Sequence, residues 1–141
     1  MDLNEYLLKL TKAVEDGVNN ATVKSAFLLE AENKRLAPVD TSQLKNSIYT
    51  SVDRPKYLAE VKARVFYADY VIHGTGIYNT LGVRRSTGWY YNVTDTSSRY
   101  YGWHFTYGQK PNNFPLQAYK NQEKNISKII DSEINKAISN M

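Results

Sequence analysis

The stretch YLAEVKARVFYADYVIHGTG, residues 57–76, contains the pattern that decides the fold. From Leu58 to Val65, long or charged side chains alternate with small apolar ones, which is the pattern of a half-buried antiparallel strand. The segment IYTSV, residues 48–52, is rich in β-formers and precedes it across DRPK, so we expect the two segments to pair as a hairpin. Residues 67–76 predict the end of this strand and a glycine turn, because glycine adopts backbone angles that a side chain forbids.

The N-terminal quarter predicts a long helix over residues 3–36. Its apolar residues recur three or four positions apart, as on one helical face. The glycine and asparagines of DGVNN, residues 16–20, have poor helix propensity, so we expect a kink there or two helices in line. Pro38 limits the far end, because the residue before a proline avoids the α region. The predicted stripe consists of Leu3, Leu7, Leu10, Val14, Ala21 and Leu28.

Two further helices follow from capping and periodicity. Asp40 is a good N-cap for a short helix, and Gln43, three positions on, completes a capping-box pattern. KPNNFP, residues 110–115, then breaks the chain ahead of a last helix. The stripe predicted for that helix is Tyr119, Gln122, Ile126, Ile129, Ile130, Ile134 and Ile138.

Residues 77–110 are aromatic and irregular, with a second predicted hairpin. WYYNV, residues 89–93, and RYYGWHF, residues 99–105, flank the polar turn cluster TDTSS. The segment has no long apolar run, which places it at a surface or an interface.

The order of elements predicts an α+β fold with an antiparallel sheet. It comprises a long N-terminal helix, a short capped helix, the sheet with its aromatic hairpin, and a C-terminal helix. At 141 residues the chain fits a single domain over residues 1–141. Its parts are the helix 1–36, the short helix and sheet 37–110, and the C-terminal helix 111–141.

Composition excludes several classes of protein. The chain has no cysteine, which rules out disulfides, cysteine nucleophiles and thiolate metal sites. No run approaches the length of a membrane span, and the first ten residues lack the features of a signal peptide, so we expect a soluble protein made in the cytoplasm of the producing cell.

The net charge is +4, and the excess of positive charge lies in residues 54–110, with 8 basic and 3 acidic side chains. That segment also holds both tryptophans and most of the tyrosines, a composition that suits nucleic acid, a protein partner or an ordinary tyrosine-rich sheet.

The residues that carry chemistry do not form a recognisable catalytic pattern. His73 and His104 are the two histidines, and a hydrolytic zinc site needs about three protein ligands. Asp69 lies four positions before His73, but a lone histidine beside a glycine turn is more often a polar turn residue. HGTG lacks the spacing of a phosphate loop, and no GxSxG elbow marks a nucleophile. RRSTG, residues 84–88, could grip phosphate and is more often a solvated loop. We therefore expect no enzyme, no metal and no cofactor.

Three short motifs in fixed order carry a resemblance. The blocks APVDTSQL, YADYVIHGT and QKPNNF resemble the tail-completion family of long-tailed double-stranded DNA bacteriophages, also called head–tail joining or neck proteins. Ser42 stands where that family usually has glycine, Ile72 where it has glutamate, and Asn113 where it has proline. The matching residues are Ala37, Pro38, Val39, Asp40, Thr41, Leu44, Tyr67, Ala68, Tyr70, Val71, Gly74, Thr75, Gln109, Pro111, Asn112 and Phe114.

The resemblance implies a structural virion protein at the neck, without catalysis or cofactor. Its members assemble as a ring of about six copies with heterologous contacts between the head connector or head-completion proteins and the tail tube or tail terminator. Genome DNA would pass nearby without specific binding, and no membrane is involved. The aromatic segment 77–107 is our candidate contact arm; the alternative is a hairpin that lies on its own sheet. The candidate interface residues are Arg84, Arg85, Trp89, Tyr90, Tyr91, Tyr100, Tyr101 and Trp103.

Two other function classes remain open from the residues alone. A small basic nucleic-acid-binding protein is motivated by the +5 balance of residues 54–110 and its interleaved tyrosines. An enzyme would use His73 or His104 as its base and would lose activity when that histidine is replaced by alanine.

Overall fold

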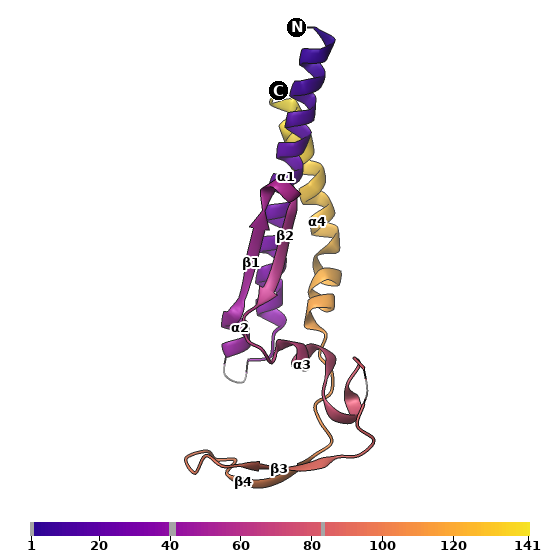
Figure 1. The fold of residues 1–141 in the computed structure, drawn as a ribbon. Coiled ribbons are helices and arrows are strands. Elements are labelled where there is room, and N and C mark those ends of the chain that lie inside the picture. Colours follow the sequence, from indigo (N-terminus) through magenta and orange to yellow (C-terminus); the bar gives the residue numbers. More distant parts are fainter. Residues whose placement is uncertain (1, 40–41, 83) are drawn as a thin grey trace. The chain divides into compact units, whose positions relative to one another are not determined.

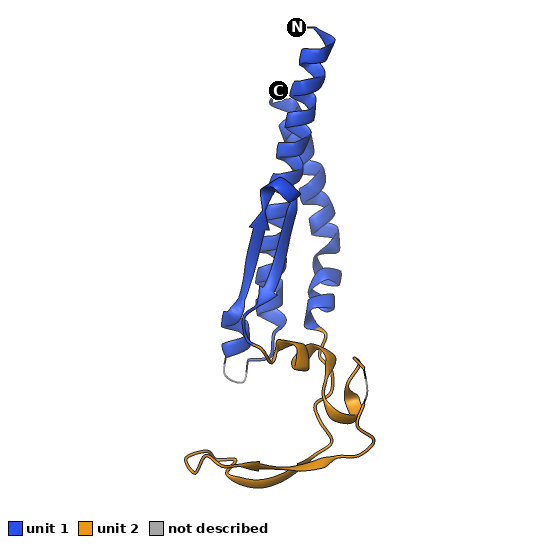
Figure 2. Ribbon diagram, viewed as in Figure 1, with its two compact units in different colours: residues 1–65, 114–141 blue, residues 66–113 orange. Residues whose placement is uncertain are grey.

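The structure, a computed structural model, describes residues 2–39, 42–82 and 84–141. The chain forms two compact units, the first of residues 1–65 and 114–141 and the second of residues 66–113 (Figure 2). That residues 1–141 constitute one domain stays a prediction. The α+β class is confirmed. The elements in chain order are α1 (Leu3–Leu36), α2 (Gln43–Ser47), β1 (Ile48–Asp53), the 3-10 turn η1 (Arg54–Lys56), β2 (Leu58–Ala63), α3 (Ala68–His73), the 3-10 turn η2 (Gly76–Tyr78), β3 (Trp89–Val93), β4 (Gly102–Thr106) and α4 (Phe114–Ser139).

Helix α1 confirms the helix predicted over residues 3–36 and runs unbroken through residues 16–20. Of the two alternatives expected there, a kink or two helices in line, the second is therefore excluded. The Asp2 side chain caps its start by accepting a hydrogen bond of 2.7 Å from the backbone N–H of Glu5. Gly17, which looked like a weak point, lies against α4. A Cβ atom there would stand 3.1 Å from the Cα atom of Ile134 and 3.2 Å from the Cβ atom of Ala137. The glycine therefore permits close helix packing.

Helices α1 and α4 lie side by side in opposite directions (Figure 1). Their interface is partly polar: Lys24 of α1 forms an ion pair with Glu133 of α4. The stripe predicted for α4 was only partly right. Ile126, Ile129 and Ile134 are half-buried, whereas Tyr119, Ile130 and Ile138 are exposed. The residues that α4 buries most are Phe114, Ala118 and Glu133, so its buried row is displaced around the helix from the row of isoleucines.

Strands β1 and β2 confirm the first hairpin. They pair antiparallel with Ile48 opposite Ala63 and Asp53 opposite Leu58. The burial of β2 alternates along its length, as predicted, and both strands contact α1. Unit 1 thus contains a helix pair with a two-stranded sheet on α1 (Figure 1).

Helix α2 leads into this hairpin. The predicted cap Asp40 and its neighbour Thr41 lie outside the described residues. Ser42, directly before the helix, has φ of +58° and makes no side-chain capping bond. This left-handed backbone angle is one that glycine adopts without penalty, which explains physically why glycine suits this position.

The second unit contains one clear correction. Residues 67–76 were predicted to end a strand, but Ala68–His73 form helix α3, with hydrogen bonds of 3.1 Å from Val71 N to Tyr67 O and 2.9 Å from Gly74 N to Tyr70 O. The physical reason is that β1 has no residue left to pair with them, since its first residue, Ile48, already pairs with Ala63 of β2. The second hairpin is confirmed: β3 and β4 pair antiparallel as a separate two-stranded sheet rather than joining the first.

Candidate interaction surface

Two segments of unit 2 are held together by backbone hydrogen bonds at the base of the second hairpin. Thr75 N donates to Gln109 O at 2.9 Å, and Asn112 N donates to Val71 O at 2.9 Å. The Thr75 hydroxyl accepts from Gln109 N at 2.8 Å. We call the paired segments 71–77 and 107–112 the clasp. It joins the start and the end of the loop that carries the hairpin.

Glycines make the clasp possible. Gly74 has φ of +79°, and a Cβ atom there would lie 2.8 Å from Gln109 O and 3.0 Å from the Cδ atom of Pro111. Gly76 has φ of +63°, and its Cβ atom would lie 2.4 Å from Tyr107 O. The prediction that both glycines adopt angles unfavourable to a side chain is confirmed. Backbone angle and close approach both require glycine here.

The structure places the three motif blocks in two groups. The second block, with Tyr67, Ala68 and Tyr70, and the third, with Gln109, Pro111 and Asn112, meet within unit 2 through the clasp. The first block lies in unit 1 and runs from the residue after α1 to the first two residues of α2. There Ala37 and Leu44 are buried, while Val39 is exposed and Pro38 is half-buried. Phe114 is buried at the start of α4. Whether these residues serve the role that the resemblance implies stays a prediction.

The hairpin beyond the clasp presents an aromatic face. In the register of β3 and β4, Tyr90 lies opposite Phe105 and Asn92 opposite Trp103. Because cross-strand partners and alternate residues share a face, this side carries Tyr90, Trp103, Phe105 and Tyr107. The ring centroids of Phe105 lie 5.1 Å from Tyr90 and 5.0 Å from Tyr107. These four side chains, which we call the aromatic face, are 48–72% exposed.

The opposite side of the hairpin is occupied by contacts of its own. The Arg85 guanidinium lies 4.4 Å from the centroid of the Trp89 ring, and Trp89 is only half-exposed. Tyr91 stacks on His104 with centroids 5.4 Å apart. The imidazole Nε2 of His104 also lies 2.5 Å from the carbonyl oxygen of Tyr100. His104 is therefore held by local packing.

The turn of the hairpin is ordered by short polar contacts. The Asp95 carboxylate accepts from the backbone N–H of Ser97 at 2.9 Å and from its hydroxyl at 2.6 Å. These bonds hold the pKa of Asp95 below its usual value. The Arg99 guanidinium donates to the Tyr100 hydroxyl at 2.6 Å. Tyr100 and Tyr101 are exposed beside this turn.

The predicted interface residues thus divide between the two sides. Tyr90 and Trp103 lie on the aromatic face, whereas Trp89 and Tyr91 lie on the other, and Arg84 and Arg85 precede β3. Sequence reasoning missed Phe105 and Tyr107. The alternation of aromatic residues along WHFTY, residues 103–107, is the signal that could have identified them.

The second hairpin differs from a buried sheet in that it has only two strands and an exposed aromatic face. A lone two-stranded hairpin is marginally stable in water, and such sheets gain stability when one face packs on another layer. In the part of the chain that the structure describes, no third strand extends this sheet. Its aromatic face is therefore suited to protein contact, where aromatic residues are enriched.

The other candidate chemistry is sparse. His73 Nδ1 lies 3.4 Å from the Thr80 hydroxyl, which also donates to the His73 carbonyl oxygen at 3.0 Å. A shallow open hollow of about 280 Å³ beside it is lined by Asp69, Tyr70, His73, Gly74, Thr75, Gly76, Asn79 and Leu81. Among residues 2–39, 42–82 and 84–141, no three histidine, aspartate or glutamate side chains gather closely enough to hold a metal ion. None of the helices described there is long and apolar enough to span a bilayer.

Comparison with known proteins gives one family. The model of the family described as "Bacteriophage HK97-gp10, putative tail-component" matches residues 1–74. This range contains α1, the first hairpin and α3, and so includes the first motif block and all of the second except its last residue, Thr75. No curated protein and no solved structure matches the chain.

Proposed function

We propose that this chain, which belongs to the HK97-gp10-like family of bacteriophage tail components, is a tail-completion or neck subunit that joins the head connector to the tail tube. The family match covers residues 1–74, and the third motif block, residues 109–114, supports the same assignment beyond the matched range. The chain acts as a structural component of the virion.

The observation that carries this proposal is the aromatic face. Four large aromatic side chains stand 48–72% exposed on a two-stranded hairpin that is anchored at its base by the clasp. A surface of this kind is costly to leave in water and is enriched at protein interfaces. It supports a subunit that is completed by assembly.

The subunit assembles as a ring of about six copies, with one face of each copy on a different face of the next, because heterologous contacts close only in a ring. Its function is positional and needs no catalytic group. The local contacts of His73 and His104 support this reading, since both histidines have structural partners.

The ring surrounds the path of the genome. Residues 84–110 carry 4 basic side chains, Arg84, Arg85, Arg99 and Lys110, against Asp95. Such charge attracts phosphate without reading sequence. DNA therefore passes through the ring as a neighbour and is not bound at a defined site.

A nonsense mutation in the gene of this protein tests the function. We expect filled heads and complete tails to accumulate unjoined, and a suppressor host to restore infectious particles. Gold-labelled antibody should mark the neck of intact virions. Normal particle yield without the protein, or label at the tail tip, would contradict the proposal.

Two controls separate the proposal from its alternatives. His73→Ala and His104→Ala should each leave particle yield unchanged if the variant folds, whereas an enzyme would lose its function. Purified protein should bind duplex DNA weakly at physiological salt; tight binding with a steep salt dependence would favour a nucleic-acid-binding protein instead.

A further inference from the structure

The N-terminal end of α1 is a second apolar surface that the described chain leaves uncovered. Leu3 is 71% exposed, Leu7 47% and Leu8 73%, and Tyr6 is 45% exposed. Within unit 1, α1 continues past the C-terminal end of α4, as the positions of the two termini show (Figure 1). We call residues 3–10 the α1 end.

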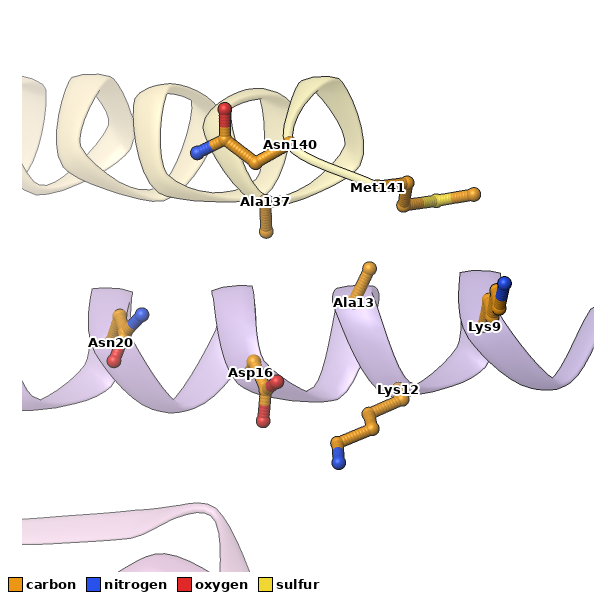
Figure 3. A pocket seen from close by; sticks show the side chains of 8 residues that line it. All are labelled: Lys9, Lys12, Ala13, Asp16, Asn20, Ala137, Asn140 and Met141. Atoms are coloured by element: carbon orange, nitrogen blue, oxygen red, sulfur yellow. The ribbon is translucent and has the colours of Figure 1, made fainter.

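This surface continues an established helix interface. On α1, one apolar row recurs at intervals of three or four residues, which places its members on one face of the helix. Gly17, the last of them, lies against α4. The row consists of Leu3, Leu7, Leu10, Val14 and Gly17. Figure 3 shows Ala137 of α4, and Asn140 and Met141 directly after that helix, above Ala13 and Lys9 of α1. The interface row of α1 therefore extends beyond the point where α4 can cover it.

The charge of the residues around the α1 end distinguishes it from the exposed side of α4. Within residues 3–10, Glu5 and Lys9 pair with each other. Residues 2–16 as a whole carry 4 carboxylates and 2 lysines, and their balance of −2 comes from Asp2, Glu15 and Asp16 against Lys12. The exposed side of α4, with Tyr119, Ile130 and Ile138, belongs to a helix with 4 lysines and 3 carboxylates, a balance of +1. The hairpin segment 84–110 has a balance of +3, from 4 basic side chains and 1 acidic. The residues that flank the α1 end thus carry charge opposite to that of the hairpin segment, which favours the α1 end over α4 as its counterpart.

We propose that the aromatic face of one copy docks on the α1 end of the next copy. The inference rests on the proposed assembly into a ring and names the two surfaces that make the contact. The contact is heterologous, because each copy contributes its aromatic face to one neighbour and its α1 end to the other neighbour.

The dimensions of the two surfaces agree. Residues 3–10 extend about 12 Å at about 1.5 Å per residue, and a five-residue strand extends about 16 Å at about 3.3 Å per residue. With 48–72% of each aromatic residue exposed, and roughly 150–250 Å² available per aromatic side chain, the aromatic face offers on the order of 500 Å². That is over half of the roughly 800 Å² that one partner contributes to a standard interface. The exposed tyrosines beside the turn can add to it.

A mixing experiment tests this pairing. The hairpin variant carries Trp103→Ser and Phe105→Ser, and the helix variant carries Leu3→Ser and Leu7→Ser. Tyr91→Ser, on the other side of the hairpin, and Leu116→Ser, which is 47% exposed on α4, are the matched controls. Sedimentation velocity over a range of concentrations measures association of the full chain, and far-UV circular dichroism checks that each variant is folded.

The expected pattern is specific to a heterologous contact. The wild-type chain should associate beyond a dimer, and each double variant alone should associate at least tenfold more weakly. Mixed in equal amounts, the two variants should form a dimer and nothing larger, because the intact α1 end of one meets the intact aromatic face of the other. The controls should behave as the wild type, and added salt should weaken association.

Three outcomes would overturn the pairing. They are a wild-type chain that stays monomeric at every soluble concentration, a mixture that does not associate, and a helix variant that associates as the wild type does. If a double variant does not fold, Trp103→Gln replaces the hairpin variant and Leu3→Gln replaces the helix variant, and their association is interpreted in the same way. A failed pairing leaves the neck function standing if the nonsense mutant still yields unjoined heads and tails, so the two proposals fail separately.

Discussion

The buried carboxylate of Glu32 gives the sharpest stability prediction. It accepts hydrogen bonds from Arg35 on its own helix and, across the helix pair, from Asn121 Nδ2 at 3.1 Å and Gln122 Nε2 at 3.0 Å. Arg35 first, then Asn121 and Gln122, lower the pKa of Glu32 from 4.5 to about 2 against the opposing effect of burial. Glu32 therefore links α1 to the first turns of α4.

The pKa sets the size of the effect. A carboxyl lowered from 4.5 to about 2 contributes at most about 3 kcal/mol to the free energy of unfolding at neutral pH. The Arg35 side chain is 63% exposed, so water screens its share. We expect Glu32→Gln to lose about 1–2 kcal/mol at pH 7.

The pH dependence has a definite sign. Because the folded pKa of Glu32 lies below the unfolded value, its stabilisation is present above pH 4.5 and is lost as the pH falls toward about 2. The difference in unfolding free energy between the wild type and Glu32→Gln should therefore shrink over that interval. Comparing the two proteins cancels the titration of other carboxyl groups.

Urea unfolding followed by far-UV circular dichroism at pH 7, 4 and 3 measures this difference. Glu5→Gln is the control, because Glu5 pairs with Lys9 at 3.6 Å on an exposed helix surface. Such a pair is worth less than about 0.5 kcal/mol. A difference between wild type and Glu32→Gln that is constant from pH 7 to pH 3 would refute the reasoning.

Four further substitutions test the backbone and the helix packing. Gly17→Leu should lower the free energy of unfolding by about 1–3 kcal/mol, because its side chain would overlap α4; a neutral result in urea unfolding would exclude the close packing. Gly74→Ala should cost about 2 kcal/mol through its backbone angle and its contact with Gln109 O, and should speed amide exchange in the clasp. Gly82→Ala, with φ of +64° but no neighbour within 4 Å, should cost only about 1 kcal/mol. Ser42→Gly should raise the free energy of unfolding by about 0.5–1 kcal/mol, and with it the melting temperature, because residue 42 has φ of +58°. A lowered melting temperature would contradict this.

Local patterns predicted most of the elements. Apolar spacing together with Pro38 located α1, alternation located the first hairpin, and a polar turn cluster between aromatic segments located the second. These patterns succeed because the period of a helix or a strand is written in neighbouring residues. The aromatic side of the second hairpin was also accessible, through the alternation of Trp103, Phe105 and Tyr107.

Pattern reasoning failed where a distant segment decides. Residues 68–73 form helix α3, because β1 has no residue that could pair with the chain after Ala63 of β2. Gly17 looked like a helix breaker, yet its place against Ile134 makes it a packing residue. The isoleucines of α4 looked like the buried row, but Ile130 and Ile138 are exposed, and the residues that the helix buries most are Phe114, Ala118 and Glu133. In each case the missing information was the position of another element.

By itself the sequence determined α1, α2, α4, the two hairpins and the phage tail-component family, because these depend on local periodicity and on short residue patterns. The tertiary structure alone decided that the second and third blocks meet in a clasp with no room for a Cβ atom. It also decided that Tyr90 joins the alternating rings of β4 on one face and that this face is left exposed. Both depend on which backbones approach each other across tens of residues. Such approach is fixed by packing and hydrogen bonding between segments and is not encoded at any single position.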